Sequence, residues 1–400
     1  MDLELLKKAR DAAHQIQEPD IQSYILKSQK KIDAHFLRMV ADQWIARQKA
    51  RYKLPTWYAN ADIIYPAPLS VEQSSSETTA HYKAQLFAKS GHENLVDLTG
   101  GMGVDTAAFA AFHKHVTYIE RNEALAPIAR HNFAVLGRTN IEVINTDALS
   151  FLHNNKALPD THYYIDPARR DSAQNKVFKI EDCEPNMLSV KPLLGEFLIK
   201  YSPILDIKQA LEQLQDITEV HIVAVENEVK ELLFLKHGNA DNTKINCINF
   251  LSDNTQQTFE FTYEQEQQLA VSYALPQKYI YEPNAAILKA GAFKSIANTY
   301  GLEKLAPNSH IYTADRLVED FAGRSFICEA VCKFDKKEIL LHLPSNQANI
   351  STRNFPLKPD EIRKKLGLKD GGDMYLFATE NHQKKKIVLI CRKTLTNIFD

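Results

Sequence analysis

The chain has 400 residues and a formal net charge of -2. Its length leaves room for two or three domains with sizeable cores. The near-neutral charge argues against a protein that coats nucleic acid along its whole length, although it leaves a local basic face open. The start, MDLELLKKARDAAHQ, is charged throughout, and no window holds the ~18 apolar residues of a membrane helix. We therefore expect a cytoplasmic protein without membrane association.

Cysteine and histidine spacing gives no sign of a metal or a disulfide framework. The five cysteines form no CxxC pair, and their odd number suits a reducing cytoplasm: Cys183, Cys247, Cys328, Cys332 and Cys391. The 14 histidines form no HExxH, and a single HxH pair, His113 and His115, does not make a ligand set by itself. We therefore expect no metal site.

Helical periodicity dominates the first part of the chain. Apolar spacing predicts helices up to about residue 55, and the Pro- and aromatic-rich stretch LPTWYANADIIYPAPLS predicts an irregular connector. In the next segment, SSSETTAHYKA, serines offer an N-cap and Glu77 lies in the first turn. A helix is therefore expected from about Ser76 to Lys89.

Strands and helices alternate from Asn94 onward. Five segments have the length and composition of strands: LVDLT, HVTYIE, IEVIN, HYYID and EVHIVAVE. Helices are expected between them at Thr106–Phe112, Ala124–Leu136 and Ile204–Gln215. This alternation indicates a mainly parallel, doubly wound α/β sheet. We expect it to end with a helix at Val229–Phe234 and an antiparallel hairpin, INCINFLS and QTFEFTYE, across the turn DNTQ.

Beyond about residue 275 the pattern changes again. YIYEPNAAILKAGAFKSIANTYGL predicts a strand end and a helix, and the last seventy residues predict strand, loop, helix and the paired strands YLFATE and KKIVLIC. Residues 331–400 hold 14 Lys and Arg against 8 Asp and Glu, a surplus of six positive charges. We expect four parts: a helical region with its connector (1–75), the α/β domain (76–275), a small α+β linker domain (276–330) and a small C-terminal α+β domain (331–400).

The stretch VDLTGGMGVD crowds Gly100, Gly101 and Gly103 between a predicted strand and a helix. Such a turn lets a ligand approach the backbone beside the helix N-terminus, although a plain tight connection also explains it. Three acidic residues end the next predicted strands: Glu120, Asp147 and Asp166. The carboxyl ends of parallel strands form the ligand-binding edge of an open sheet. The four features together therefore indicate a binding site.

The sequence resembles the class I S-adenosylmethionine-dependent methyltransferases over residues 76–275. VDLTGGMGVD is similar to their first motif, Glu120 to the second, Asp147 to the third and DPAR to the fourth. The resemblance implies a Rossmann-like seven-stranded methyltransferase sheet and S-adenosyl-L-methionine as cofactor. It implies seven cofactor-binding residues: Asp97, Thr99, Gly100, Gly101, Gly103, Glu120 and Asp147. Thr106 stands where a dinucleotide pattern would need a third small residue, which argues against a nicotinamide dehydrogenase.

Two further segments carry a more specific resemblance. SSSETTAHYKA is similar to the helix before the first strand of trimethylguanosine-synthase-like RNA methyltransferases, where it helps to bind the cofactor. RNFPLKPDEIRKKLGLKDGGDMYLFAT resembles the THUMP-like domain of a bacterial branch of these enzymes. That domain implies binding to tRNA or rRNA. We expect Arg363, Lys364 and Lys365 to contact RNA. The alternative is that these residues only form a solvated face of their helix.

The DPARR segment predicts the chemistry. Amine-methylating members of this fold commonly use (Asp/Asn)-Pro-Pro-(aromatic) to hold the target amino group. Asp166 and Pro167 match the first half and are expected to be catalytic, whereas Ala168 and Arg169 depart from the motif. Arg169 and Arg170 are expected to contact a base or an RNA phosphate. They could equally pair with the acidic residues downstream: Glu181, Asp182 and Glu184.

DPAR also resembles the DPPR motif of 5-methyluridine methyltransferases, which use a cysteine nucleophile. Cys183 is the cysteine near the motif, and its acidic neighbours disfavour a thiolate, so we expect a structural role. The function predicted is methylation of an exocyclic amine of a base in RNA. The alternatives are a non-RNA substrate, and an RNA-binding module whose methyltransferase domain is catalytically impaired.

Overall fold

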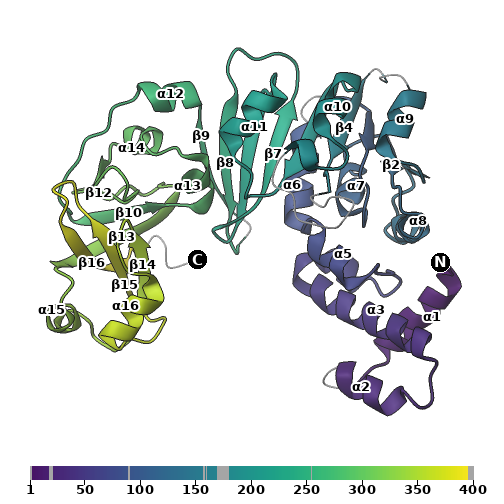
Figure 1. The fold of residues 1–400 in the computed structure, drawn as a ribbon, viewed down its shortest axis with the longest axis horizontal. Coiled ribbons are helices and arrows are strands. Elements are labelled where there is room, and N and C mark those ends of the chain that lie inside the picture. Colours follow the sequence, from purple (N-terminus) through teal and green to yellow (C-terminus); the bar gives the residue numbers. More distant parts are fainter. Residues whose placement is uncertain are drawn as a thin grey trace. The chain divides into compact units, whose positions relative to one another are not determined.

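The computed structural model describes residues 2–17, 21–88, 91–155, 158, 160–168, 180–253 and 255–394. The chain divides into two compact units (Figure 1). The first comprises Met1–Asp216 with Leu235–Asn239, and the second comprises Ile217–Phe234 with Ala240–Asp400. Among the described residues, no helix has both the length and the apolar character that crossing a membrane requires.

The first unit begins with the expected helical region, which lies at the purple end of the chain in Figure 1: α1 (Leu3–His14), α2 (Ile21–Ser28) and α3 (Ala34–Lys53). Asp2 and Asp33 cap α1 and α3, because their carboxylates accept hydrogen bonds from backbone N–H groups of the first turn. The connector is not wholly irregular. It contains two short helices that each begin at a proline: α4 (Pro55–Ala59) and α5 (Pro68–Gln73).

Five parallel strands form the sheet of the first unit in the order β3-β2-β1-β4-β5. Their bounds are β1 (Asn94–Asp97), β2 (His115–Ile119), β3 (Ile141–Ile144), β4 (Thr161–Ile165) and β5 (Glu196–Tyr201). The sequence analysis missed β5. Because β1 pairs with both β2 and β4, the strand order reverses there, which is where open α/β sheets bind ligands.

Helices alternate with these strands as expected. They are α6 (Glu77–Ala88), α7 (Val104–Phe109), α8 (Leu125–Val135), α9 (Ala148–Asn154), α10 (Met187–Val190) and α11 (Ile207–Leu214). Of these, α9 and α10 were not predicted. The Ser76 hydroxyl accepts a hydrogen bond from the Thr79 N–H and so caps α6, as predicted. All five residues of β4 are buried, as expected for a parallel strand that is covered on both faces.

Four strands follow in the order β7-β6-β8-β9: β6 (Glu219–Val225), β7 (Glu228–Lys236), β8 (Lys244–Phe250) and β9 (Gln256–Phe261). They belong to the second unit except for the last two residues of β7. The β8–β9 pair is antiparallel, which confirms the predicted hairpin. The helix predicted at Val229–Phe234 is wrong, because that segment lies in β7. Its Leu- and Lys-rich sequence suits a helix, but burial of Leu232–Leu235 in a sheet overrides that propensity. Strands β1–β9 therefore exceed the seven expected of the methyltransferase sheet.

A seven-stranded sheet in the order β11-β12-β10-β13-β16-β15-β14 follows. Its strands are β10 (Tyr279–Pro283), β11 (Glu303–Lys304), β12 (Tyr312–Ala314), β13 (Gly323–Cys332), β14 (Asn349–Arg353), β15 (Met374–Glu380) and β16 (Lys386–Lys393). The helices of this unit are α12 (Tyr263–Gln268), α13 (Ala285–Ala290), α14 (Ser295–Tyr300), α15 (Lys336–Leu341) and α16 (Pro359–Leu366). The sequence analysis missed α12, α15, β11, β12 and β14. The antiparallel β15–β16 pair confirms the predicted closing hairpin.

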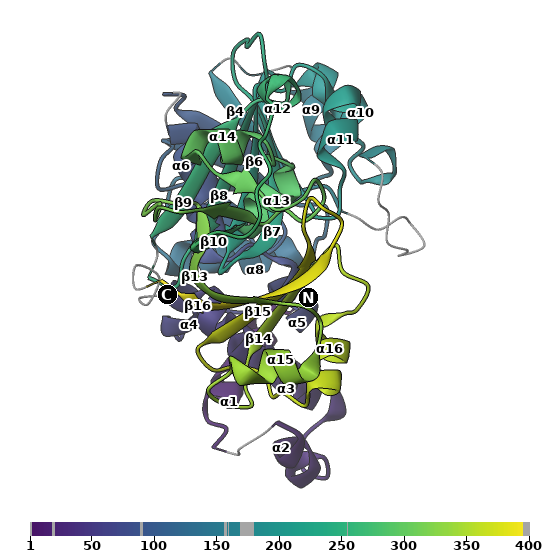
Figure 2. The ribbon, with the colours of Figure 1, turned by 90° about the vertical axis from the view of Figure 1, so that its left-hand side faces the viewer.

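Helices α15 and α16 cover one face of the last strands (Figure 2). Ile362 and Leu366 of α16 are buried in a cluster with Met374 and Leu376 of β15 and Val388 of β16. Helix α16 begins at Pro359, and its Ile362 and Leu366 side chains turn inward. That orientation leaves Lys364 and Lys365 exposed on the opposite face.

Candidate active site

A cavity of about 960 Å³ lies at the carboxyl ends of the parallel strands in the first unit. Its wall contains all seven residues that the resemblance implies for cofactor binding: Asp97, Thr99, Gly100, Gly101, Gly103, Glu120 and Asp147. Asp166 and Pro167, the expected catalytic pair, line the same cavity. Side chains from four strand ends and their loops thus meet in one place.

The glycine turn is explained in part by the protein's own core. A Cβ atom on Gly100 would lie 2.1 Å from Cε2 of Tyr118, and one on Gly103 would lie 2.6 Å from Cζ of Phe133. Gly101 differs, because its Cβ would meet only the Thr99 carbonyl oxygen, 3.8 Å away. Aromatic packing therefore requires two of the glycines, and only at Gly101 is the space beside the backbone open.

Asp97 holds the turn together from the end of β1. Its carboxylate accepts hydrogen bonds from the Thr99 N–H (3.0 Å) and from the Thr106 hydroxyl (2.6 Å). The side chain is buried, and this burial, which outweighs its hydrogen bonds, raises the pKa of Asp97 to about 7. Thr106, which breaks the dinucleotide pattern, thus has a role of its own in tying α7 to β1.

Glu120 is fixed by two backbone donors. The Gly101 N–H donates to Oε2 (2.8 Å) and the Asn122 N–H donates to Oε1 (2.7 Å). The Tyr118 hydroxyl donates to the Gly101 carbonyl (2.6 Å) and holds the turn from the other side. A carboxylate oxygen has capacity for a second hydrogen bond, so Glu120 can also accept from the hydroxyls of a ligand.

Asp147 closes another side of the cavity as the N-cap of α9. Its carboxylate accepts a hydrogen bond from the Ser150 N–H (2.9 Å). The hydrogen bonds with Ser150 hold the pKa of Asp147 below its ordinary value. Ala148 and Leu149, which follow it in the first turn of α9, also line the cavity.

Asp166 lies where β4 ends, and two contacts position it. Its backbone N–H donates to the Thr99 hydroxyl (2.7 Å), which links it to the glycine turn. Its carboxylate forms an ion pair with Lys200, a largely buried side chain near the end of β5. Sequence reasoning missed Lys200 because it did not recognise β5 as a strand, although the apolar run FLI between Glu196 and Lys200 was an available signal.

A buried ionic network attaches α6 to this site. Lys83 is fully buried, and its Nζ lies 3.2 Å from Oδ1 of Asp105. The Ser75 and Tyr164 hydroxyls each donate to Asp105 Oδ2 at 2.8 Å. Burial alone would raise the pKa of Asp105, but the charges of Lys83 and Lys200 and these hydrogen bonds leave it lowered. A lysine inside the apolar pattern of α6 was the available signal for this network.

The segment after Asp166 holds two of the predicted substrate-binding residues. Arg169 and Arg170 lie outside the described residues. Among the acidic groups that were their alternative partners, the Glu184 carboxylate forms an ion pair with Arg121 at 2.5 Å. Cys183 is buried and lines the cavity.

The basic residues of α16 belong to the second unit. The Arg363 guanidinium forms ion pairs with Asp360 and Asp370, whereas Lys364 and Lys365 are exposed. The three residues thus share one helix, but Arg363 already has anionic partners on the protein.

Comparison with known proteins agrees with this geometry. Three family models match: ribosomal RNA adenine dimethylase at residues 82–178, a ferredoxin-like domain at 279–321 and a THUMP domain-like model at 323–393. A crystal structure of a "putative methyltransferase" from Porphyromonas gingivalis W83 is 34% identical, covers 98% of this chain and 99% of that chain, and superimposes with a TM-score of 0.87.

Two curated relatives are similar over smaller parts. An uncharacterized S-adenosylmethionine-dependent methyltransferase of Mycobacterium tuberculosis is 24% identical over 318 residues, which are 78% of this chain and 83% of that protein. A ribosomal RNA small subunit methyltransferase J of Legionella pneumophila is 33% identical over 94 residues, which are 22% of this chain and 38% of that protein.

Fold and site together define an α/β methyltransferase with an N-terminal helical region and a separate small C-terminal sheet, as the sequence predicts. The chain belongs to the class I S-adenosylmethionine-dependent methyltransferases that carry a C-terminal THUMP-like domain. S-adenosyl-L-methionine is the cofactor of this family.

Proposed function

We propose that the protein methylates an exocyclic amine of a base in RNA. The observation that carries this proposal is that Asp166 and Pro167 share one cavity with the glycine turn and Glu120. The adenine dimethylase model and the similarity to the L. pneumophila ribosomal RNA methyltransferase support RNA as the substrate class. The THUMP-like domain supports the same substrate class, with tRNA or rRNA as the partner.

The residues of the cavity fit the cofactor. The open space beside Gly101 admits the methionine portion, and Glu120 has acceptor capacity for the ribose hydroxyls. Asp147 and the first turn of α9 lie where the adenine would bind. S-adenosylmethionine supplies a methyl group that the sulfonium already activates.

The protein's own contribution to the reaction is to position the amine. The Asp166 carboxylate accepts a hydrogen bond from one N–H of the amino group, and the Pro167 carbonyl accepts one from the other. These two bonds fix the direction of the nitrogen lone pair. Lys200 holds the Asp166 carboxylate in place through their ion pair.

Basic groups would hold the RNA. We propose that Arg169 and Arg170 contact the base or a phosphate, since the motif lacks the stacking aromatic residue. Lys364 and Lys365 would contact phosphates. Arg363 would contribute less to RNA binding, because it already forms ion pairs with Asp360 and Asp370. The division of the chain at residues 75, 275 and 330, and the cytoplasm as its location, belong to the same proposal.

Mass spectrometry of nucleosides from cells with and without the gene tests this function. One N-methylated nucleoside of tRNA or rRNA should disappear in the deletion strain and return when the gene is restored. An unchanged set of RNA nucleosides would contradict the proposal and favour a non-RNA substrate. Cofactor binding by the purified protein without transfer to any RNA would favour the RNA-binding module.

A further inference from the structure

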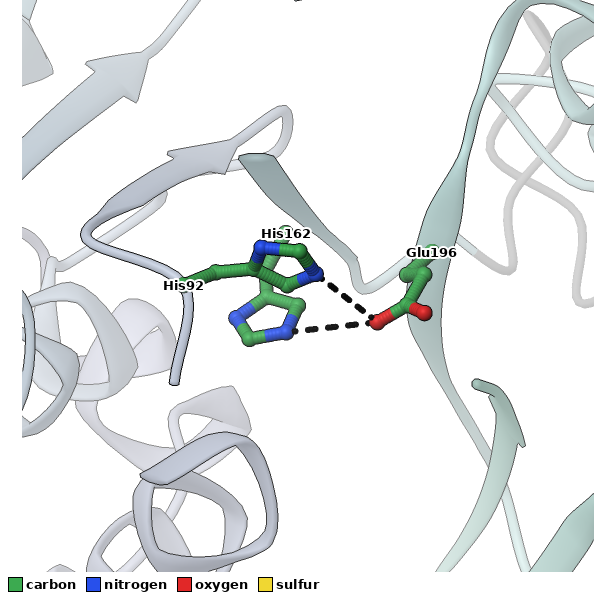
Figure 3. Close-up of side chains that lie close together, drawn as sticks. All are labelled: His92, His162 and Glu196. Atoms are coloured by element: carbon green, nitrogen blue, oxygen red, sulfur yellow. Dashed lines mark hydrogen bonds and ion pairs between the residues drawn. The ribbon is translucent and has the colours of Figure 1, made fainter. Parts of the chain in front are cut away.

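A second group of chemically active side chains lies at the amino ends of β4 and β5, whereas Asp166 and Lys200 lie toward their carboxyl ends. His162 is the second residue of β4 and Glu196 is the first residue of β5; His92 lies just before β1. Figure 3 shows the two imidazole rings turned toward the same carboxylate oxygen. The Nε2 atoms of His92 and His162 lie 3.2 Å and 3.6 Å from Glu196 Oε2.

These separations are those of atoms that share one metal ion. Zinc binds imidazole nitrogen and carboxylate oxygen at ~2.0–2.2 Å, and two such ligands of a tetrahedral ion are about 3.3 Å apart. The two observed distances, 3.2 Å and 3.6 Å, lie on either side of that value. One ligand atom from each of the three residues lies within 4.8 Å of the other two.

The hydrogen bonds behind His162 determine its tautomer. His113 Nδ1 lies 3.0 Å from the Phe109 carbonyl, which can only accept, so Nδ1 carries the hydrogen. In the neutral ring His113 Nε2 is then an acceptor, and it takes a hydrogen bond from His162 Nδ1 at 3.1 Å. In this tautomer His162 Nε2 carries a lone pair and lies on the side of Glu196 Oε2.

A metal ion bound by His162 Nε2 and Glu196 Oε2 would form a coordinate bond to each atom. A ligand histidine that donates its other ring N–H is the usual arrangement around a bound metal. Neutral imidazole with carboxylate is a donor set of the zinc class of divalent cations.

The ligand atoms are held in place by their surroundings. The fully buried His162 ring stacks on Phe87 with a centroid distance of 4.1 Å. On Glu196, the Gly238 N–H donates to Oε1 at 3.2 Å, and His237 Nδ1 lies 2.6 Å from Oε2 on the more exposed side. A site with these supports loses little conformational freedom when a metal binds.

We propose that His92, His162 and Glu196 form a binding site for a zinc-class divalent cation at the amino ends of β4 and β5. The metal would tie the segment before β1 to the starts of two strands whose other ends carry Asp166 and Lys200. Three protein ligands leave one position, which water fills. The sequence predicted no metal because it was searched for closely spaced ligands, and these three residues come from distant parts of the chain.

Zinc titration of the metal-stripped, tag-free full-length protein tests this site. Calorimetry should show one saturable equivalent of Zn²⁺, and thermal unfolding should move to a higher Tm with Zn²⁺. His92→Ala and Glu196→Gln should each weaken binding at least about tenfold and remove the Tm shift. Co²⁺ in place of Zn²⁺ should give the strong visible absorption of a four-coordinate site.

His115→Ala is the matched control, because His115 is an exposed histidine at the start of the neighbouring β2. It should bind Zn²⁺ like the wild type. The partly exposed His92 keeps the test decisive even where Glu196→Gln fails to fold. No saturable binding by the wild type, or equal binding by His92→Ala, would overturn the proposal and leave an ion-pair network between the histidines and Glu196.

Discussion

Among single residues, Glu120 has the clearest expected role in binding the cofactor. Glu120→Ala removes the acceptor proposed for the ribose hydroxyls and leaves the Gly101 and Asn122 N–H groups without it. Hydrogen bonds to a charged group contribute about 1.5–3 kcal/mol. Calorimetry should therefore show S-adenosylmethionine affinity falling by roughly tenfold to 150-fold. Equal affinities of Glu120→Ala and wild type would show that the cofactor does not contact this carboxylate.

Asp97 gives a prediction about pH at the same scale. Its pKa is about 7 in the folded protein, far above the ordinary value of 3.8, because the carboxyl is buried. Between these values the folded state binds more protons than the unfolded state, so stability should fall as pH rises from about 4 to about 7. Asp97→Asn, which stays neutral, should lose less stability over this range than the wild type.

Thermal unfolding of both proteins at pH 5 and at pH 8 measures this effect. The drop in Tm between the two pH values should be smaller in Asp97→Asn. The same drop in both proteins would mean that Asp97 is ionised throughout, with its charge satisfied by the Thr99 and Thr106 hydrogen bonds.

At the scale of elements, the glycines in the turn between β1 and α7 have different roles: Gly103 is needed for packing, and Gly101 is expected to serve cofactor binding. Gly103→Ala places a Cβ 2.6 Å from Phe133 in a backbone with φ +85°, so it should lower the free energy of unfolding by ~2–4 kcal/mol. Gly101→Ala meets no close neighbour and should cost only ~1–2 kcal/mol, from its φ of +55°. It should weaken cofactor binding more than it weakens the fold.

Denaturant unfolding and calorimetry on the two variants check this order. Gly101→Ala should remain folded with reduced S-adenosylmethionine affinity. Gly103→Ala should show the larger loss in the free energy of unfolding. If Gly101→Ala binds the cofactor like the wild type, the open space at this position is not part of the binding site.

The elements also show how far sequence reasoning reaches. Strands β1–β4 were predicted because β-branched and aromatic residues alternate with clear helices, and their ends correctly marked one cavity. The buried run of β7 resembles a helix, since only its place in the sheet decides its conformation. Lys83 and Lys200 were not assigned to the site, because the carboxylates that pair with these buried lysines are distant in sequence.

At the scale of the whole molecule, the surplus of positive charge in residues 331–400 predicts how RNA is held. Phosphate contacts make affinity fall with salt, by roughly one unit of log–log slope per contact. Charge reversal of Lys364 and Lys365 should weaken RNA binding and flatten that slope, while S-adenosylmethionine binding stays unchanged. Adding Arg363 to the reversal should have a smaller effect, because Asp360 and Asp370 already pair with it.

Filter binding across a salt series measures these effects. Reversal of the exposed Lys30 and Lys31 changes the net charge by the same amount and serves as the control. Equal losses in the two double variants would mean that net charge, and not the α16 surface, determines RNA affinity. A flat salt dependence in the wild type would argue against RNA docking through phosphates.

The central claim is that Asp166 positions an RNA amine for methylation, and methyl transfer by the purified protein tests it most directly. RNA from a strain that lacks the gene is incubated with labelled S-adenosylmethionine, and the nucleosides are separated. The wild type should place the label on a base amine. Asp166→Ala should lose that turnover but keep its cofactor affinity, as expected for a group that acts on the transition state. Label on a carbon or a ribose oxygen, or full activity in Asp166→Ala, would contradict the account.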